Sequence, residues 1–293
     1  MLPIKKIYID SKHRTVDSLS SSHFKYDLPE SYLMPNDCGF YVCDVCIPHS
    51  WYTIEHGIND RFYIHTSNDN TNVAARPAAY YAIILDSKQY TGAELATELS
   101  AKMAARLTGT SYSGGLTASY NASTQRITIV TTYNDMTFKI LTANDIKTKL
   151  GGDWVGTTTS DNYNENDPCD INSEMLKLTS GNAGYQSFTN PFVSGYINLQ
   201  PIRNFYLHSS NIGSYNTIGL YGCKTIIKKI PVTADFNYMI IDQAMAGNDF
   251  MDCSKITLKQ LEFQLLNEDG KIVPLHNANI SFSLVFDIMD TKA

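Results

Sequence analysis

A short stretch with helical periodicity lies inside a chain that otherwise shows the two-residue alternation of β-strands. Residues 80–151 contain the two segments with helical character, and Gly, Pro, Asn and Ser interrupt the alternating segments on both sides. Strands, then a compact helical unit, then strands again indicate a unit inserted into a loop of a β-sandwich. We therefore predict a mainly β fold, with residues 1–77 and 153–293 in the sandwich and residues 78–152 in an inserted domain.

The inserted domain is predicted to be a small α/β unit of order β-α-β-β-α. A strand over 80–85 precedes Thr91 and Glu94, whose spacing is that of a capping box at a helix start. Leucine or methionine then recurs every four residues from Leu95 to Leu107, which gives the helix one apolar stripe. Such a stripe is typical of packing on the domain's own sheet, although it also suits a cofactor or partner. We expect residues 127–131 and 137–140 to pair as a hairpin, followed by a second helix over 144–150.

The flanking segments supply the strands of the sandwich. Residues 258–265 put leucine and phenylalanine on one face and glutamine and glutamate on the other, and residues 280–288 alternate in the same way. Pro29 is expected to stop the strand that begins at Phe24. The strands number about eight to ten, enough for a single jelly-roll β-sandwich. The predicted sandwich strands cover residues 4–10, 24–28, 40–47, 61–66, 204–209, 225–230, 238–242, 258–265 and 280–288.

Motifs that carry chemistry are missing from the sequence. It has no G-x-S-x-G, H-E-x-x-H, P-loop or G-x-G-x-x-G pattern. Cys43 and Cys46 form a lone C-x-x-C in a predicted strand, where positions i and i+3 face opposite sides, so free thiols are favoured over a metal site. We predict no catalytic, cofactor-binding or metal-binding residues, and therefore no enzyme.

Scattered charged and histidine residues leave weaker alternatives. Jelly-roll metal enzymes gather two histidines and an acidic residue on neighbouring strands, but the spacing of His65, His208 and His276 does not support such a site. The lysines around the 225–230 strand suit contact with nucleic acid or with an acidic neighbour, but a place on the outer face of a sandwich is the commoner explanation: Lys224, Lys228 and Lys229. The acidic pairs in loops lack the calcium-loop pattern: Asp167 with Asp170, and Asp249 with Asp252.

Charge and hydropathy exclude some partners. A net charge of −6 argues against general affinity for nucleic acid. No apolar run reaches the roughly 18 to 20 residues that span a bilayer. The first residues turn polar by Asp10 and lack the apolar core of a signal peptide, so we expect a protein made and kept inside a cell, at least initially.

Trp51 and Tyr52 are the candidate interface residues. They directly follow a strand that ends at Pro48. Aromatic residues in a loop that leaves a strand anchor interfaces, and they equally well cap the end of a sandwich core. The sequence does not separate these two roles.

Several segments resemble the minor capsid (penton) proteins of Polinton or Maverick elements and of adintoviruses. The resemblance covers most of the chain, including the predicted insert. It rests on segments starting with Ile7-Tyr-Ile-Asp10-Ser, Arg14-Thr15 and Phe24-Lys-Tyr-Asp-Leu-Pro29, on Tyr41-Val42, Asp44-Val45, Ile47-Pro48-His49, Trp51-Tyr-Thr-Ile54 and Gly57-Ile-Asn-Asp60, and on Ser214-Tyr-Asn-Thr-Ile-Gly219, Ile226-Ile-Lys-Lys-Ile-Pro-Val232 and Leu261-Glu-Phe to Val273-Pro-Leu-His276.

The resemblance implies a structural role at a capsid vertex. Members of this family are single jelly-roll proteins that form pentamers at the fivefold vertices of icosahedral virions, beside a double jelly-roll major capsid protein. Similar virophage pentons carry an extra domain in an outward jelly-roll loop, where the predicted insert would lie. The implied partners are the protein itself, the major capsid protein and a host receptor, with no specific nucleic acid and no membrane span. The rival hypothesis is a receptor- or carbohydrate-binding jelly-roll module, such as a spike or fibre head, and a cupin-type metal enzyme is a distant third.

Overall fold

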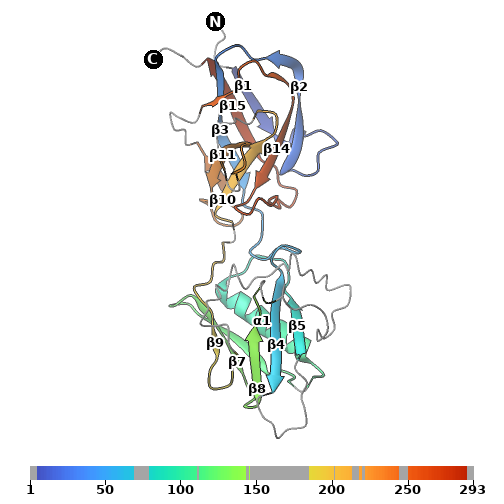
Figure 1. Ribbon diagram of the computed structural model, residues 1–293, viewed down its shortest axis with the longest axis vertical. Helices are drawn as coiled ribbons and strands as arrows, with labels where there is room; N and C mark the ends of the chain where they lie inside the picture. The colour runs from blue at the N-terminus through green and yellow to red at the C-terminus, as the bar shows by residue number, and fades with distance from the viewer. Residues whose placement is uncertain are drawn as a thin grey trace. The chain divides into compact units, whose positions relative to one another are not determined.

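The computed structural model describes residues 5–68, 79–110, 112–142, 145, 185–200, 202–212, 218–219, 222–243 and 250–288. The chain forms two compact units. Unit 1 comprises Met1–Trp51 and Ile202–Ala293, and unit 2 comprises Tyr52–Pro201. Unit 1 is therefore built from both ends of the chain, which Figure 1 shows as blue and orange-to-red strands lying together.

One sheet of unit 1 joins the first strand of the chain to the last. β1 (Lys5–Asp10) pairs antiparallel with β15 (Ser281–Ile288), which pairs with β3 (Cys38–Pro48). β3 also pairs with β12 (Met239–Asp242) and with the short β13 (Met251–Asp252). The sheet order is β1-β15-β3-β12, with β13 beside β3.

The second sheet of unit 1 has the order β11-β10-β14-β2. Its strands are β2 (His23–Leu33), β10 (Asn204–Ser209), β11 (Ile226–Pro231) and β14 (Thr257–Leu266). All of its pairings are antiparallel. In this topology consecutive strands alternate between the two sheets except at the β10–β11 hairpin and at β12 and β13, which both pair with β3. The terminal strands β1 and β15 pair with each other, and with β12 and β13 counted as one interrupted strand this is the two-sheet, eight-stranded jelly roll. The predicted sandwich is confirmed as a jelly roll.

Apolar side chains from both sheets form one core in unit 1. Phe24 and Phe263 are opposite each other on β2 and β14, with ring centroids 5.5 Å apart, and Phe282 of β15 approaches Phe263 edge-on at 4.9 Å. Leu284 and Phe286 continue the buried face of β15. This inward alternation is what fixes the register of each strand, because a shift by one residue would expose the apolar set.

Pro29 does not end β2, contrary to the sequence prediction. β2 continues to Leu33, and its register against β14 shifts between Leu258 and Gln260. The strand lies at the edge of its sheet, so a proline at an irregular position there removes no ladder hydrogen bond that the sheet requires.

Unit 2 contains one long helix and two antiparallel sheets within the described residues. The first sheet has the order β5-β4-β8, from β4 (Arg61–Asn68), β5 (Ala79–Ile84) and β8 (Met136–Ile140). The second has the order β6-β7-β9, from β6 (Leu116–Asn121), β7 (Arg126–Thr131) and β9 (Phe192–Val193). Figure 1 shows α1 (Gly92–Leu107) among these strands.

Helix α1 begins and packs as the sequence predicts. The Thr91 hydroxyl accepts from the Glu94 amide, and the Glu94 carboxylate accepts from the Thr91 amide at 2.8 Å. The apolar stripe is fully buried in the core of unit 2, so it serves the domain's own packing. The hydroxyl of Ser100 bonds both to the backbone of its own helix and to the backbone of Ala118 on β6, which fixes the helix on that strand.

Two predictions about unit 2 differ from the structure. Residues 127–131 and 137–140 do not form a hairpin, because β7 pairs with β6 and β8 pairs with β4 in the other sheet. The pattern of β6, with alanine, serine and asparagine, did not reveal it as a strand. Residues 144–150 lie outside the described residues except Asp145, which makes reciprocal hydrogen bonds with Thr142 of the kind found at helix starts.

The boundaries of unit 2 are wider than the predicted 78–152. β4 and β9 belong to unit 2 because β4 pairs with β5 and β8, and β9 pairs with β7. Residue 54 also forms a bridge with Lys88. In the sequence, unit 2 lies between β3 and β10 of unit 1.

Candidate functional site

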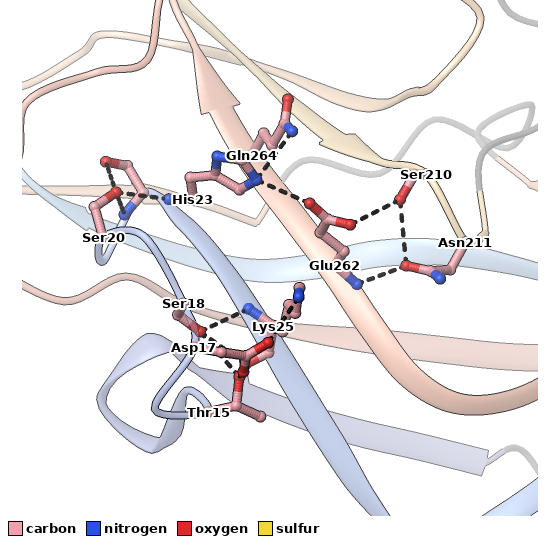
Figure 2. A network of polar contacts seen from close by, with 11 residues as sticks. Thr15, Asp17, Ser18, Ser20, His23, Lys25, Ser210, Asn211, Glu262 and Gln264 are labelled. Carbon is pink, nitrogen blue, oxygen red and sulfur yellow. Dashed lines mark hydrogen bonds and ion pairs between the residues drawn. The ribbon is translucent and has the colours of Figure 1, made fainter.

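A polar network covers the outer face of the β2–β14 pair in unit 1. Alternation on β14 turns Leu261, Phe263 and Leu265 into the core and leaves the intervening glutamate and glutamine side chains outside. β2 does the same with Phe24 inside. The residues of this outer-face network are Thr15, Asp17, Ser18, Ser20, His23, Lys25, Ser210, Asn211, Glu262 and Gln264 (Figure 2).

His23 links the two strands of the network. Its Nε2 lies 2.8 Å from Oε1 of Glu262 and 3.1 Å from the side-chain nitrogen of Gln264. The Asn211 side-chain oxygen accepts from the Glu262 amide at 2.7 Å, and the Ser210 hydroxyl donates to the Glu262 carboxylate at 3.4 Å. Glu262 is therefore contacted from both sides, by His23 on β2 and by Ser210 and Asn211, which follow β10.

A second part of the network ties a loop to β2. Nζ of Lys25 lies 2.7 Å from Oδ2 of Asp17, and the Thr15 hydroxyl donates to Oδ1 of the same carboxylate. The hydrogen bond from Lys25 is the main cause that lowers the pKa of Asp17 to about 2, and Asp17 in turn raises the pKa of Lys25. Both side chains are solvent-accessible, so the pair orders the loop more than it stabilises the fold.

This arrangement is a set of polar side chains that hydrogen-bond mainly to one another on the outer face of the sheet. Each labelled group in Figure 2 has a hydrogen-bond partner. In the part of the chain that the structure describes, no group of three His, Cys, Asp or Glu side chains is arranged to hold a metal ion.

The three histidines that the metal-enzyme hypothesis needs are not brought together. His65, on β4 of unit 2, lies with Nδ1 2.9 Å from the Tyr185 hydroxyl. His208, on β10 of unit 1, lies 2.9 Å from the Thr225 hydroxyl. His276 lies 2.7 Å from the backbone oxygen of Ser50. Each imidazole is thus engaged in its own local hydrogen bond.

Trp51 is buried in the core of unit 1, with 1% of its surface exposed. It stacks on His49 with ring centroids 3.8 Å apart and meets Phe205 edge-on at 4.8 Å. Tyr52 is half-buried and is the first residue of unit 2. Of the two roles left open by the sequence, the packing supports core capping for Trp51. The interface role of Trp51 and Tyr52 stays a prediction.

The C-x-x-C cysteines lie on one face of β3, contrary to prediction. Their partners on β15 are Ser283 for Cys43 and Ser281 for Cys46, and residues i and i+2 of a strand share a face. A β-bulge is the reason: the register shifts between these serines, and Asp44 has a positive φ of 50°. Both thiols are free.

The three lysines around the 225–230 strand do not share one environment, because Lys224 and Lys229 are exposed and Lys228 is not. Lys228 is not on the outer surface, because its side chain is only 9% exposed and lies between the sheets. Its Nζ is 3.5 Å from Oδ2 of Asp242 on β12 and donates to the backbone oxygen of Val42 on β3 at 3.3 Å. Lys228 faces the core and is paired there with a carboxylate from the other sheet, which alternation in the sequence of β11 alone does not reveal.

Of the acidic loop pairs compared with the calcium-binding pattern, Asp249, Asp167 and Asp170 lie outside the described residues.

Sequence reasoning missed the outer-face network as a unit. The polar positions of β14 were identified, but their partners on β2 are more than 230 residues away, as in the Gln264–His23 contact with a separation of 241. Only the strand order brings them together. The available signal was the matching alternation of His23, Lys25 and Asp27 on β2.

The strand order defines a single jelly roll, and a second compact unit lies in the sequence between its third and fourth strands, β3 and β10. Among solved structures, the chain is similar to the penton protein of mavirus, with a TM-score of 0.50 and 10% sequence identity. The similarity covers 97% of this chain and 99% of the mavirus chain. No protein-family model and no curated protein matches the sequence. Among the described residues, no helix is long and apolar enough to cross a membrane.

Proposed function

We propose that this chain is a minor capsid (penton) protein, a jelly-roll subunit that forms homopentamers at the fivefold vertices of an icosahedral virion. The observation that carries the proposal is the jelly-roll strand order, together with a fold similarity to a viral penton protein that extends over nearly all of both chains. The sequence resemblance to pentons of Polinton or Maverick elements and adintoviruses supports the same role from separate evidence.

A pentamer needs two different patches on each subunit, because a cyclic interface of odd order is heterologous. The edge strands of one sheet, β1 and β12, offer such patches. Tyr8 on β1 is 70% exposed, and Ile241 on β12 is 58% exposed. Large apolar side chains exposed at sheet edges are candidates for burial against a neighbour. We assign Tyr8 and Ile241 to the two sides of the subunit contact.

The remaining partners follow from the vertex position. A double jelly-roll major capsid protein would surround the pentamer, and the protein would be made in the host cytoplasm or nucleus before it enters the virion. The net charge of −6 suits a shell protein that does not hold the genome through its own surface.

Unit 2 supports a second, compatible role. It is a compact unit with its own core, placed in the sequence between β3 and β10. We propose that it is the outward domain of the vertex and contacts a host receptor. The alternative function is a receptor- or carbohydrate-binding jelly-roll module of a spike or fibre head.

The oligomeric state separates these functions. Mass photometry of the purified protein, alone and after mixing with the major capsid protein, should give a species of five times the 32.7 kDa chain mass. A persistent monomer or trimer that binds glycans in an array would contradict the penton proposal and favour the spike or fibre module.

A further inference from the structure

Two thiols from opposite ends of the sequence meet inside unit 1. Cys38 begins β3, and Cys253 directly follows β13. Their sulfur atoms lie 3.6 Å apart, although the residues are separated by 215 positions in the chain. Both thiols are free in the structure.

The backbone around the pair has the geometry of adjacent antiparallel strands. Met251 pairs with Phe40 and Asp252 with Gly39, so Cys253 lies opposite Cys38 in the same register. The Cys253 amide donates to the Cys38 carbonyl oxygen at 2.9 Å. Directly opposite residues of an antiparallel pair have Cα atoms about 4.5–5.5 Å apart, which falls within the range that a disulfide spans. Bond formation thus needs rotation of side chains and little backbone movement.

The surroundings keep the thiols protonated. Cys38 is 3% exposed and Cys253 is fully buried. Burial raises the pKa of both thiols. The sulfur of Met34, 4.0 Å from the Cys38 sulfur, is a further apolar neighbour. Since the thiolate is the reacting form, the pair stays reduced in a reducing cell and reacts only when β13 opens locally.

We propose that Cys38 and Cys253 form a reversible disulfide when the protein meets an oxidising environment that contains a small-molecule disulfide. One cysteine loses its proton and attacks the small disulfide, which releases one small thiol and leaves a mixed disulfide. The second cysteine then attacks the protein sulfur of that mixed disulfide, which releases the second small thiol. The two cysteines lose two electrons and two protons in total, and the small disulfide gains them.

The bond would fasten the edge of the β1-β15-β3-β12 sheet. β13 is short and pairs only with β3 among the described strands, so its attachment is the weak part of that edge. The bond would also close a chain segment that includes all of unit 2, which restricts the unfolded state. The proposed disulfide is argued from the geometry of Cys38 and Cys253 alone. Only the event that would expose the protein to oxidation, the release of a particle from the cell, rests on the proposed capsid function.

The test is oxidation of the purified full chain with oxidised glutathione in the presence of a metal chelator. A low urea concentration that leaves the fold intact should speed the reaction, because it favours local opening of β13. We expect a Cys38–Cys253 peptide in a non-reducing digest analysed by mass spectrometry, and a melting temperature of unit 1 that rises by about 5 °C or more. Reduction with dithiothreitol should reverse both changes.

Matched variants make the result specific. Cys253→Ala should abolish both the linked peptide and the melting shift, whereas Cys46→Ala, on the same β3 strand, should leave both intact. Oxidation of Cys43 or Cys46 without a Cys38–Cys253 peptide would overturn the proposal. A linked peptide accompanied by a lower melting temperature would also overturn it, because the bond would then distort the native sheet. Mass photometry of the same samples tests the pentamer separately, so the two proposals fail independently.

Discussion

The imidazole of His49 stacks on the indole of Trp51 at 3.8 Å, at the point where the chain leaves unit 1. His49 Nδ1 donates to the backbone oxygen of Ala234 at 2.8 Å, so the ring that supports the tryptophan is itself fixed by the segment before β12. Trp51 therefore packs in the core of unit 1, at the end of the strand that precedes it.

Trp51→Ala should destabilise unit 1 by about 3–5 kcal/mol, because it empties a large buried volume beside Phe205. Urea unfolding followed by far-ultraviolet circular dichroism measures this loss. Tyr52→Ala, at a half-buried position, is the matched control and should cost clearly less. A Trp51→Ala protein with unchanged stability but a lost oligomer would instead support an interface role.

Lys228→Met should destabilise unit 1 by about 3–5 kcal/mol, since it leaves Asp242 in a site with little access to water. The double variant Lys228→Met, Asp242→Leu should recover much of that loss, because the second change removes the buried charge. Chemical unfolding of the two single variants and the double variant forms the thermodynamic cycle. Strict additivity of the two single effects would contradict a coupling between Lys228 and Asp242.

Ile241→Glu should weaken the proposed pentamer at least about tenfold in its dissociation constant while the monomer stays folded. The charge replaces an exposed apolar side chain on β12, so the fold loses no buried contact. Dilution series in mass photometry measure the change, and Tyr8→Glu tests the opposite edge strand. Tyr196→Glu, at another exposed position but in unit 2, should have no effect on assembly. Equal weakening by all three variants would argue against an interface at β1 and β12.

Low pH should destabilise unit 1 through two buried histidines. Burial lowers the pKa of His49 and of His208 from 6.5. Once the pH falls below 6.5, the unfolded chain binds more protons than the folded chain. The stability that unit 1 has with both imidazoles neutral is therefore fully present above pH 6.5 and is lost as the pH falls toward the folded pKa values. The charge of Asp235 opposes this effect at His49, because it raises the pKa of the imidazole.

The measurement uses the fluorescence of Trp51 in a Trp154→Phe background, since the chain has two tryptophans. In the parent protein, the denaturant concentration at which half of the protein is unfolded should decrease as the pH is lowered from about 7 to about 5. The double variant His49→Gln, His208→Gln should show a weaker dependence, and His13→Gln, at an exposed position, should behave as the parent. An identical pH slope in the double variant would contradict the assignment.

The sequence predicted the strands of unit 1 better than their connections. Alternation located β14 and β15 nearly to the residue, because one face of each strand is buried and the other is wet. It did not reveal the bulge at Asp44, because a bulge depends on how β3 meets β15 and not on β3 alone. For the same reason the contact of His23 with Glu262 was not predicted, since it requires the order of strands in the sheet.

The boundaries of unit 2 also depend on strand pairing, which the sequence of a single strand does not show. Helical periodicity marks α1, so the predicted insert was drawn around it as 78–152. β4 has the same alternation as the strands of unit 1, and only its pairing with β5 and β8 assigns it to unit 2.

Two deletions distinguish these boundaries. Replacement of residues 52–201 by a flexible Gly/Ser linker should leave unit 1 folded, because it removes unit 2 as a whole and cuts no strand pair of the jelly roll. Deletion of only 78–152 should give an unstable or aggregating protein, because β4 then loses β5 and β8, and β9 loses β7. Circular dichroism and the cooperativity of urea unfolding report the outcome. A well-folded 78–152 deletion beside an unfolded 52–201 deletion would show that the narrower boundary, drawn from helical periodicity, is the correct one.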